Sequence, residues 1–356
     1  MQLSEYINIE QYSLPGKLKN QYFLDLMVQL HHHHYAHSAE YKKISDVIFP
    51  SSEKIQSIEN IPFVPVSLFK NHSLKSIADD KVYKVLTSSG TTGSTPSLIY
   101  LDAGASRLQT LALSKIITHI LSKERLPMLI VDSKSVISDR QSFSARGAGI
   151  LGLSVFGKNH FYLLDDTFEI DYKGLADFLS KYNGQRMLIF GFTFMVWQYL
   201  FLSDMREKID LSKSVLIHSG GWKKLQEIAV DNTVFKKSLN EKSGIKEIYN
   251  FYGMIEQIGS VFLENSDGYL HCPNFSDIII RNPKNFSVQK NGEAGLIQAL
   301  SVLPQSYPGH SILTEDIGVC MGEDDASNGW KGKYFKILGR AKKAELRGCS
   351  DTFVKK

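Results

Sequence analysis

The fold of this chain is indicated most directly by seven small residues that follow a short apolar run: Thr87-Ser88-Ser89-Gly90-Thr91-Thr92-Gly93. A loop of this composition can turn its backbone N–H groups and its five hydroxyls toward one anion, such as the phosphates of a nucleotide. It is not a Walker loop, because no Gly-Lys-Ser or Gly-Lys-Thr closes it. Taken alone, the stretch is more typical of a polar surface loop, so its meaning depends on the rest of the chain.

Short apolar runs alternate with helical patterns along the middle of the chain. This alternation predicts an α/β domain whose strands are mostly parallel and buried. Beyond about residue 268, alternating patterns with turn signals such as Asn291-Gly292 and Asn328-Gly329 predict a smaller antiparallel β subdomain. The predicted strands of the α/β part cover residues 82–86, 128–131, 188–190, 215–217 and 248–252, and a helix is predicted near residues 105–121.

The first 60 residues show helical patterns. Histidines at positions 31–34 and 37 suggest a metal site, but no glutamate follows in the spacing of a metalloprotease helix, and we assign no metal to them. The two prolines of residues 61–70 exclude helix and predict an extended connector. Residues 187–202 are apolar but shorter than the roughly 20 residues of a membrane span, and they predict a buried strand that runs into a helix.

Composition restricts the class of protein. The 356 residues are 22% charged and 43% hydrophobic, which is typical of a folded globular chain and excludes disorder. The net charge of +4 comes without a polybasic run, so nucleic acid is not predicted as a partner. Three cysteines and an N-terminus without a signal-peptide pattern predict a reduced, cytoplasmic protein with no transmembrane segment.

Three further motifs follow the loop in order along the chain. They are Asn250-Phe251-Tyr252-Gly253-Met254-Ile255-Glu256, Leu313-Thr314-Glu315-Asp316-Ile317-Gly318 and Leu338-Gly339-Arg340. With the loop, they resemble the phosphate-binding signature, the Tyr-Gly-x-Thr-Glu motif, the Thr-Gly-Asp segment and the Gly-Arg hinge of adenylate-forming enzymes. Ile255 stands where that superfamily usually has threonine. The shared order makes coincidence a poor explanation.

Within that superfamily, the chain resembles most the acyl-protein synthetases, the fatty-acid-activating component of bacterial luminescence systems. This narrower resemblance rests on residues 61–70, on His218-Ser219-Gly220-Gly221-Trp222-Lys223 and on Arg347-Gly348-Cys349-Ser350-Asp351. It implies a large α/β adenylate-forming domain with mostly parallel sheets flanked by helices, plus a smaller antiparallel β subdomain. The implied domains are residues 1–338 (helical segment 1–60, α/β part 61–267, β subdomain 268–338) and a hinge motif with a short tail over 339–356.

The resemblance also implies ATP and Mg²⁺ as cofactors and gives each motif a role. Glu256 is expected to ligate Mg²⁺, a hard cation that prefers oxygen ligands. Asp316 is expected to accept hydrogen bonds from the ribose hydroxyls, and Arg340 to place a cation near the ribose or the α-phosphate. The full predicted nucleotide site is Thr87, Ser88, Ser89, Gly90, Thr91, Thr92, Gly93, Ser219, Gly220, Gly221, Tyr252, Gly253, Asp316 and Arg340.

Cys349 is the predicted acyl acceptor. The resemblance implies that a fatty acyl group passes from AMP to this thiol and then to a partner, typically an acyl-CoA-reductase-like protein. Three basic residues near it in the sequence, Lys342, Lys343 and Arg347, would favour the reactive thiolate, whereas Asp351 would oppose it. Judged by residue type alone, Cys349 is equivalent to the other two cysteines, because a free cysteine is more often an inert small hydrophobe.

The chain departs from the superfamily at its C-terminal end. Most adenylate-forming enzymes carry a further domain with a catalytic lysine, whereas this sequence ends at Lys356, so the resemblance implies that the full-size C-terminal domain is absent. The positive charge must then come from another basic residue of this chain or from a partner chain. We expect Lys223 in this role, with Lys224, Lys342 and Lys343 as further candidates, so the predicted catalytic residues are Cys349, Arg340 and Lys223.

Three functions stay open at this point. The favoured one is an ATP-dependent ligase that forms acyl-AMP, from a fatty acid as the family implies, and transfers the acyl group to a protein thiol. The second is a shortened CoA ligase of the phenylacetate type. The third is a degenerate ligase that serves as a scaffold subunit, which the missing lysine and Ile255 favour and the intact Glu256, Asp316 and Arg340 oppose.

Overall fold

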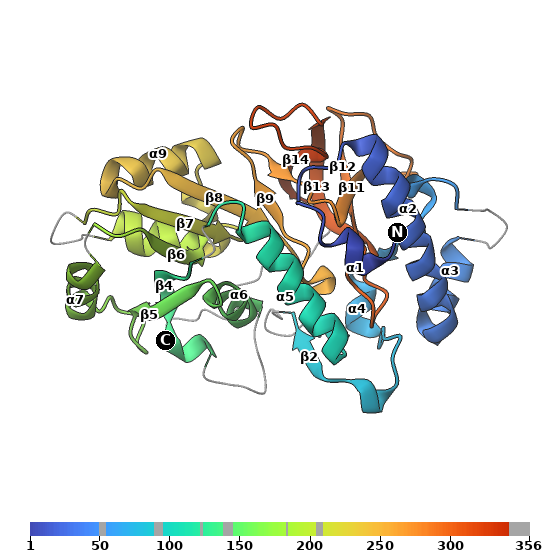
Figure 1. Cartoon of the computed structure of the whole chain (residues 1–356), viewed down its shortest axis with the longest axis horizontal. Coiled ribbons are helices and arrows are strands. Elements are labelled where there is room, and N and C mark those ends of the chain that lie inside the picture. Colours follow the sequence, from blue (N-terminus) through green and yellow to red (C-terminus); the bar gives the residue numbers. More distant parts are fainter. Residues whose placement is uncertain are drawn as a thin grey trace. The chain divides into compact units, whose positions relative to one another are not determined.

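The computed structural model describes residues 1–49, 55–88, 95–121, 124–137, 145–182, 184–203 and 209–341. These residues form two compact units, whose elements are labelled in Figure 1. Unit 1 takes its described residues from both halves of the chain, within 1–117 and 253–341, whereas those of unit 2 lie within 118–252. Among the described residues, no helix combines the length and the apolar character needed to cross a membrane.

Unit 2 contains a parallel sheet with the strand order β8-β7-β6-β4-β5. Strands β4, β6 and β7 are buried along their whole length, as their unbroken apolar runs predict for parallel strands covered on both faces. The elements of unit 2 are β4 (Leu126–Ser133), η3 (Lys134–Ile137), α6 (Ala145–Ser154), β5 (Gly157–Leu164), α7 (Tyr172–Tyr182), β6 (Met187–Phe192), α8 (Thr193–Val196), the π-helix η4 (Trp197–Leu202), β7 (Ser214–Ser219), η5 (Lys223–Ile228), α9 (Asn232–Ser243) and β8 (Glu247–Tyr252).

Unit 1 contains an antiparallel sheet with the order β11-β12-β13-β14-β10-β9, and β1 adds to β13 in parallel. A separate two-stranded ladder joins β2 and β3. The elements of unit 1 are α1 (Leu3–Tyr6), α2 (Gly16–His37), α3 (Ala39–Ile48), η1 (Ile58–Asn60), β1 (Val64–Pro65), α4 (Leu68–Asn71), η2 (Asp79–Lys81), β2 (Lys84–Thr87), β3 (Leu98–Leu101), α5 (Ala103–Ile117), η6 (Ile255–Gln257), β9 (Phe262–Glu264), β10 (Leu270–His271), β11 (Ser276–Arg281), β12 (Ala294–Ser301), β13 (Ser311–Glu323) and β14 (Lys333–Arg340).

The predicted α/β class is confirmed, with parallel strands in unit 2 and antiparallel strands after residue 268. Residues 187–202 form the predicted buried strand followed by helix. Three local predictions were wrong. The run at 82–86 belongs to an antiparallel pair in unit 1, helix α5 ends at Ile117 rather than near 121, and the connector at 61–70 includes the short helix α4 after its second proline.

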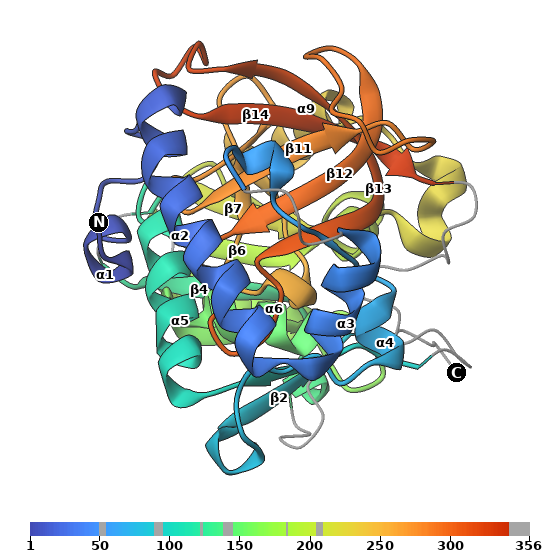
Figure 2. The same cartoon turned by 90° about the vertical axis from the view of Figure 1, so that its right-hand side faces the viewer.

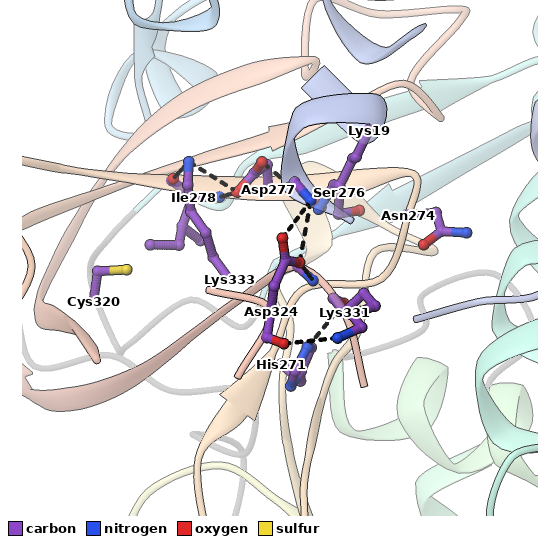
Figure 3. Close-up of polar contacts among 12 residues, drawn as sticks. Lys19, His271, Asn274, Ser276, Asp277, Ile278, Cys320, Asp324, Lys331 and Lys333 are labelled. Atoms are coloured by element: carbon purple, nitrogen blue, oxygen red, sulfur yellow. Dashed lines mark hydrogen bonds and ion pairs between the residues drawn. The ribbon is translucent and has the colours of Figure 1, made fainter. Parts of the chain in front are cut away.

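Helix α2, shown with the strands of unit 1 in Figure 2, is joined to the sheet by an ion cluster of the buried Lys19 and Asp277 with the partly buried Lys333 (Figure 3). The Lys19 amine lies 3.6 Å from the Asp277 carboxylate and donates to the Ser276 carbonyl at 2.7 Å, and the Lys333 amine lies 3.4 Å from the same carboxylate. Burial acts to raise the pKa of Asp277, but the two lysine charges outweigh it and hold the pKa below its usual value. One carboxylate therefore joins α2, β11 and β14.

We expect Asp277→Ala to destabilise the protein by about 3–5 kcal/mol, because it leaves the two lysine charges of the cluster without their carboxylate. The free energy of unfolding can be measured by urea denaturation followed by circular dichroism. The exposed Asp46 is a matched control, since its carboxylate accepts a hydrogen bond from Tyr35 at the surface. Asp46→Ala should cost less than about 0.5 kcal/mol, and equal losses in the two variants would contradict the role of the ion cluster.

Two histidines of α2, His31 and His34, pack with Tyr41 and with His310 in the loop before β13. His34 is fully buried, both of its ring nitrogens have hydrogen-bond partners, and its ring stacks on His310 at a centroid distance of 5.0 Å. The Tyr41 hydroxyl lies 2.9 Å from His31 and 3.3 Å from His310. Burial, to which the neighbouring rings add, lowers the pKa of His34 to about 3 and that of His31 to about 4. These rings are therefore neutral at neutral pH.

The free energy of unfolding should fall as the pH falls from about 6.5 toward the lowered pKa values. The unfolded chain binds protons on these histidines below about pH 6.5, whereas the folded chain does not, so acid favours unfolding. His34 should contribute up to about 1.4 kcal/mol per pH unit in this range. Denaturation at about pH 7, 6 and 5 should show a smaller slope for His34→Gln than for the wild type. The exposed neighbour His32, replaced by glutamine, should keep the wild-type slope, and three equal slopes would contradict the prediction.

Candidate functional site

The Thr-Glu-Asp segment of β13 lies in a bulge of unit 1. Between two matched residue pairs of the β12–β13 ladder, β12 contributes only Ile297, whereas β13 contributes residues 314–316. The Thr314 hydroxyl stabilises the bulge, because it donates to the Ile297 carbonyl at 2.7 Å and accepts from the Asp316 N–H at 3.1 Å. Bulges of this kind redirect side chains and are common beside active sites.

Arg340, the last residue of β14, is directly opposite Asp316 in the β13–β14 ladder. Its Nε lies 3.4 Å from an Asp316 carboxylate oxygen, and its Nη2 donates to the Glu315 carboxylate at 3.0 Å. The three side chains are 22–28% exposed, so this pairing lies at the surface rather than in the core. The structure thus brings together Asp316 and Arg340, which were predicted from separate motifs.

Glu256 lies in η6, three residues after Gly253, and only 6% of its surface is exposed. Burial raises the pKa of its carboxyl and the negative charge of Glu315 adds to that rise, while the Ser97 hydroxyl and the Arg340 charge oppose it. Glu256 is therefore within electrostatic range of the Glu315–Arg340 pair. A third predicted site residue lies in the same region of unit 1.

The predicted phosphate loop is described only at its two ends. Thr87 is the last residue of β2, the Ser88 N–H donates to the Ser97 carbonyl at 3.1 Å, and the Ser97 N–H donates to the Ser88 hydroxyl at 2.8 Å. These two hydrogen bonds close the base of the loop. Ser89, Gly90, Thr91, Thr92 and Gly93 lie outside the described residues.

The predicted adenine-binding residues lie at one edge of the sheet in unit 2. Strand β7 ends at Ser219 and the parallel neighbour β8 ends at Tyr252, and the Ser219 hydroxyl donates to the Phe251 carbonyl at 2.8 Å. Gly220 has φ +80°, a conformation that favours glycine. A Cβ built on Gly221 would meet no described atom within 4 Å, so the backbone is open on that side. Ligands of α/β proteins commonly bind at this carboxyl edge.

The predicted catalytic residues are only partly placed. Lys223 is the first residue of η5, but its side chain is not among the described ones. Lys342, Lys343 and Cys349 lie outside the described residues. The two described cysteines are both buried. Burial raises the pKa of Cys272 well above its usual value and that of Cys320 to about 11, so both are protonated thiols at neutral pH.

Two residues of the unit 1 region were not predicted from the sequence. Glu315 lies inside the motif of residues 313–318, at the position where the Thr-Gly-Asp pattern has glycine. This departure from the pattern could have identified Glu315 as a residue of the site. Ser97 carries no comparable signal, because it is one of several hydroxyl residues in a polar stretch, and only the fold places it beside Glu256.

Comparison with known proteins gives consistent matches. The family model described as "Acyl-protein synthetase, LuxE" matches residues 10–356. Two relatives bear the name Long-chain-fatty-acid--luciferin-component ligase. The Vibrio harveyi protein is 23% identical over 345 residues, covering 89% of this chain and 83% of that protein. The Aliivibrio fischeri protein is 23% identical over 341 residues, covering 89% and 84%.

Two solved structures illustrate the similarity of the fold. An open conformation of 2-hydroxyisobutyryl-CoA ligase, in complex with 2-HIB-AMP and CoA, is 13% identical, has a TM-score of 0.71, and the match covers 92% of this chain and 71% of that one. ATP-bound MatB from Rhodopseudomonas palustris is 14% identical with a TM-score of 0.50, covering 74% and 49%.

The fold and the ordered motifs define an adenylate-forming ligase, an enzyme class that activates a carboxylic acid as its acyl-AMP. The family model matches nearly the whole chain and identifies one family within this class. The chain belongs to the LuxE family of acyl-protein synthetases, which are AMP-forming acyl-protein ligases.

Proposed function

We propose that this chain activates a long-chain fatty acid with ATP and Mg²⁺ and passes the acyl group to the Cys349 thiol. The observation that carries the proposal is the contact of Asp316 with Arg340, two residues of separate motifs, together with the electrostatic effect of Arg340 on the buried Glu256. Family membership supports acid activation, and the names of the two relatives support a long-chain fatty acid as the substrate.

Adenylation is the step to which the unit 1 residues contribute. A carboxylate oxygen attacks the α-phosphorus of ATP, the bond from that phosphorus to the β-phosphate oxygen breaks, and pyrophosphate leaves as acyl-AMP forms. Asp316 would accept hydrogen bonds from the ribose hydroxyls. Arg340 would stabilise the negative charge that develops at the α-phosphate. Together they would fix the α-phosphate in position for attack.

Glu256 would be the protein ligand for Mg²⁺. Burial disfavours the ionised form of its carboxyl, and a bound cation would restore that form. Mg²⁺ is typically held by one or two protein carboxylates together with phosphate oxygens of the nucleotide, so a single buried carboxylate fits this mode. When bound, the ion neutralises phosphate charge.

Thioester formation would follow at Cys349. Its thiolate attacks the acyl carbonyl carbon, the bond to the AMP oxygen breaks and AMP leaves, while the thiol proton passes to solvent. Cys272 and Cys320 are poor candidates, because burial keeps both protonated. The acyl group would then go to an acyl-CoA-reductase-like partner.

We also propose a cytoplasmic location. Cys272 and Cys320 are free thiols, which are typical of proteins in a reducing compartment.

The purified protein, incubated with ATP, Mg²⁺ and a radiolabelled long-chain fatty acid, should release pyrophosphate and acquire a hydroxylamine-sensitive label. Cys349→Ser should lose the label and keep pyrophosphate release, because adenylation precedes the thiol step. Cys320→Ser is the control and should keep both activities.

Other results would change the conclusion. Label that persists in Cys349→Ser would mean that another residue is the acceptor. Acyl transfer to added CoA without labelled protein would support a CoA ligase instead. ATP binding without acid-dependent pyrophosphate release would support a scaffold subunit.

Glu256→Gln should lower acid-dependent pyrophosphate release on the order of 100-fold, because it removes the carboxylate charge from the metal site. In the wild type, the Mg²⁺ concentration that gives half-maximal release should rise as the pH falls toward the raised pKa of Glu256, since protons compete with the ion. A Mg²⁺ titration at several pH values measures both effects. The exposed Glu293, replaced by glutamine, should behave as the wild type, and an unchanged Glu256→Gln would remove Glu256 from the site.

A further inference from the structure

We propose that Glu315 is a positioning residue that holds the Arg340 guanidinium for the nucleotide, an inference that rests on the function proposed for Asp316 and Arg340. The Thr-Gly-Asp pattern has glycine at this position, and glycine has no side chain to hold an arginine. In this chain the position carries a carboxylate instead, and that carboxylate contacts the arginine of the hinge motif.

Glu315 holds the end of β14 through both its side chain and its main chain. Its carboxylate accepts from Nη2 of Arg340 at 3.0 Å, and its carbonyl oxygen accepts from the Ala341 N–H at 2.9 Å. The neighbouring Asp316 lies 3.4 Å from Nε of the same guanidinium. The hydrogen bond from Glu315 and the nearby charge of Asp316 act on two different nitrogens, so together they restrict rotation of the planar guanidinium more than either would alone.

The bulge in β13 makes this double contact possible. In a regular strand, successive side chains point to opposite faces, so adjacent residues such as Glu315 and Asp316 would not reach one guanidinium. Residues 314–316 leave the regular ladder with β12, and the Thr314 hydroxyl stabilises this backbone. The same local structure thus directs both carboxylates toward Arg340.

The exposure of the Glu315–Arg340 pair allows an effect on activity to be distinguished from an effect on stability. The Arg340 and Glu315 side chains are 28% and 27% exposed, and ion pairs with this access to water contribute little to folding. A positioning role therefore predicts loss of activity with little loss of stability. The partly exposed pair of Arg186 and Glu247 in unit 2, with nitrogen and oxygen 2.7 Å apart, is a matched control.

Glu315→Ala removes the carboxylate, and Glu315→Gln keeps an oxygen that can accept from Nη2. We expect Glu315→Ala to lower the kcat of acid-dependent pyrophosphate exchange at least about tenfold, since a misplaced charge stabilises the transition state poorly. Glu315→Gln should retain at least about half of the wild-type rate. Both variants, and the control Glu247→Ala, should melt within about 2 °C of the wild type.

A double-mutant cycle tests whether Glu315 acts through Arg340. In an Arg340→Lys background, which lacks the guanidinium fork, Glu315→Ala should change the exchange rate by less than about twofold. The full tenfold loss in that background would mean that Glu315 acts by another route and would overturn the proposal.

ATP binding measured by calorimetry separates this inference from the proposed function. Glu315→Ala should raise the Kd for ATP with Mg²⁺ at least about threefold, and Glu247→Ala should leave it unchanged. If the wild type binds ATP but exchanges no pyrophosphate, the ligase function fails and the Kd values still decide the role of Glu315. Equal Kd values and exchange rates in all three proteins, with an active wild type, would overturn the role of Glu315 alone. A wild type that does not bind ATP would overturn both.

Discussion

A single carboxylate, Asp277, is shared inside unit 1 by Lys19 of α2 and Lys333 of β14. Taking charges out of water costs several kcal/mol per ion, so such a cluster is tolerated only when every partner is in place. Lys333 is the first residue of β14 and Arg340 is the last, about 23 Å apart at the rise of an extended strand. The strand that presents Arg340 to Asp316 is therefore anchored at its other end by the ion cluster.

The bulge of β13 brings the carboxylates of Glu315 and Asp316 to the guanidinium of Arg340. The charges of Glu315 and Arg340 act in turn on Glu256, whose burial raises the pKa of its carboxyl. The Mg²⁺ proposed above would favour the ionised form of Glu256, since a nearby cation opposes the effect of burial on a carboxyl group.

The sequence predicted those features that depend on local patterns. Unbroken apolar runs such as Met187–Phe192 predict buried parallel strands, and the order of the motifs predicts that Asp316 and Arg340 serve one site. Strand β5 was not predicted because its first half is exposed after Gly157, which hides the apolar signal. The antiparallel partner of β2 could not be predicted either, since pairing depends on contacts outside the run.

Other features depend on residues that are distant in the sequence. Lys19 has the pattern of a surface lysine, and its burial follows from a carbonyl acceptor 257 positions later. The contact of Glu315 with Arg340 depends on the bulge in β13, where three residues lie opposite one residue of β12. The sequence of neither strand alone indicates this bulge. The burial of His34 likewise needs the loop before β13.

Unit 1 is assembled from both ends of the described chain, and this has a consequence for its synthesis. Helix α2 leaves the ribosome early, whereas β11 and β14, which carry the partners of Lys19, are made last. The middle stretch within 118–252 can fold before them, since domains generally fold as units during translation. Until then, α2 lacks the later part of unit 1, and its residues Phe23, Met27 and Leu30, which are buried in the folded protein, would present an apolar surface of the kind that chaperones bind.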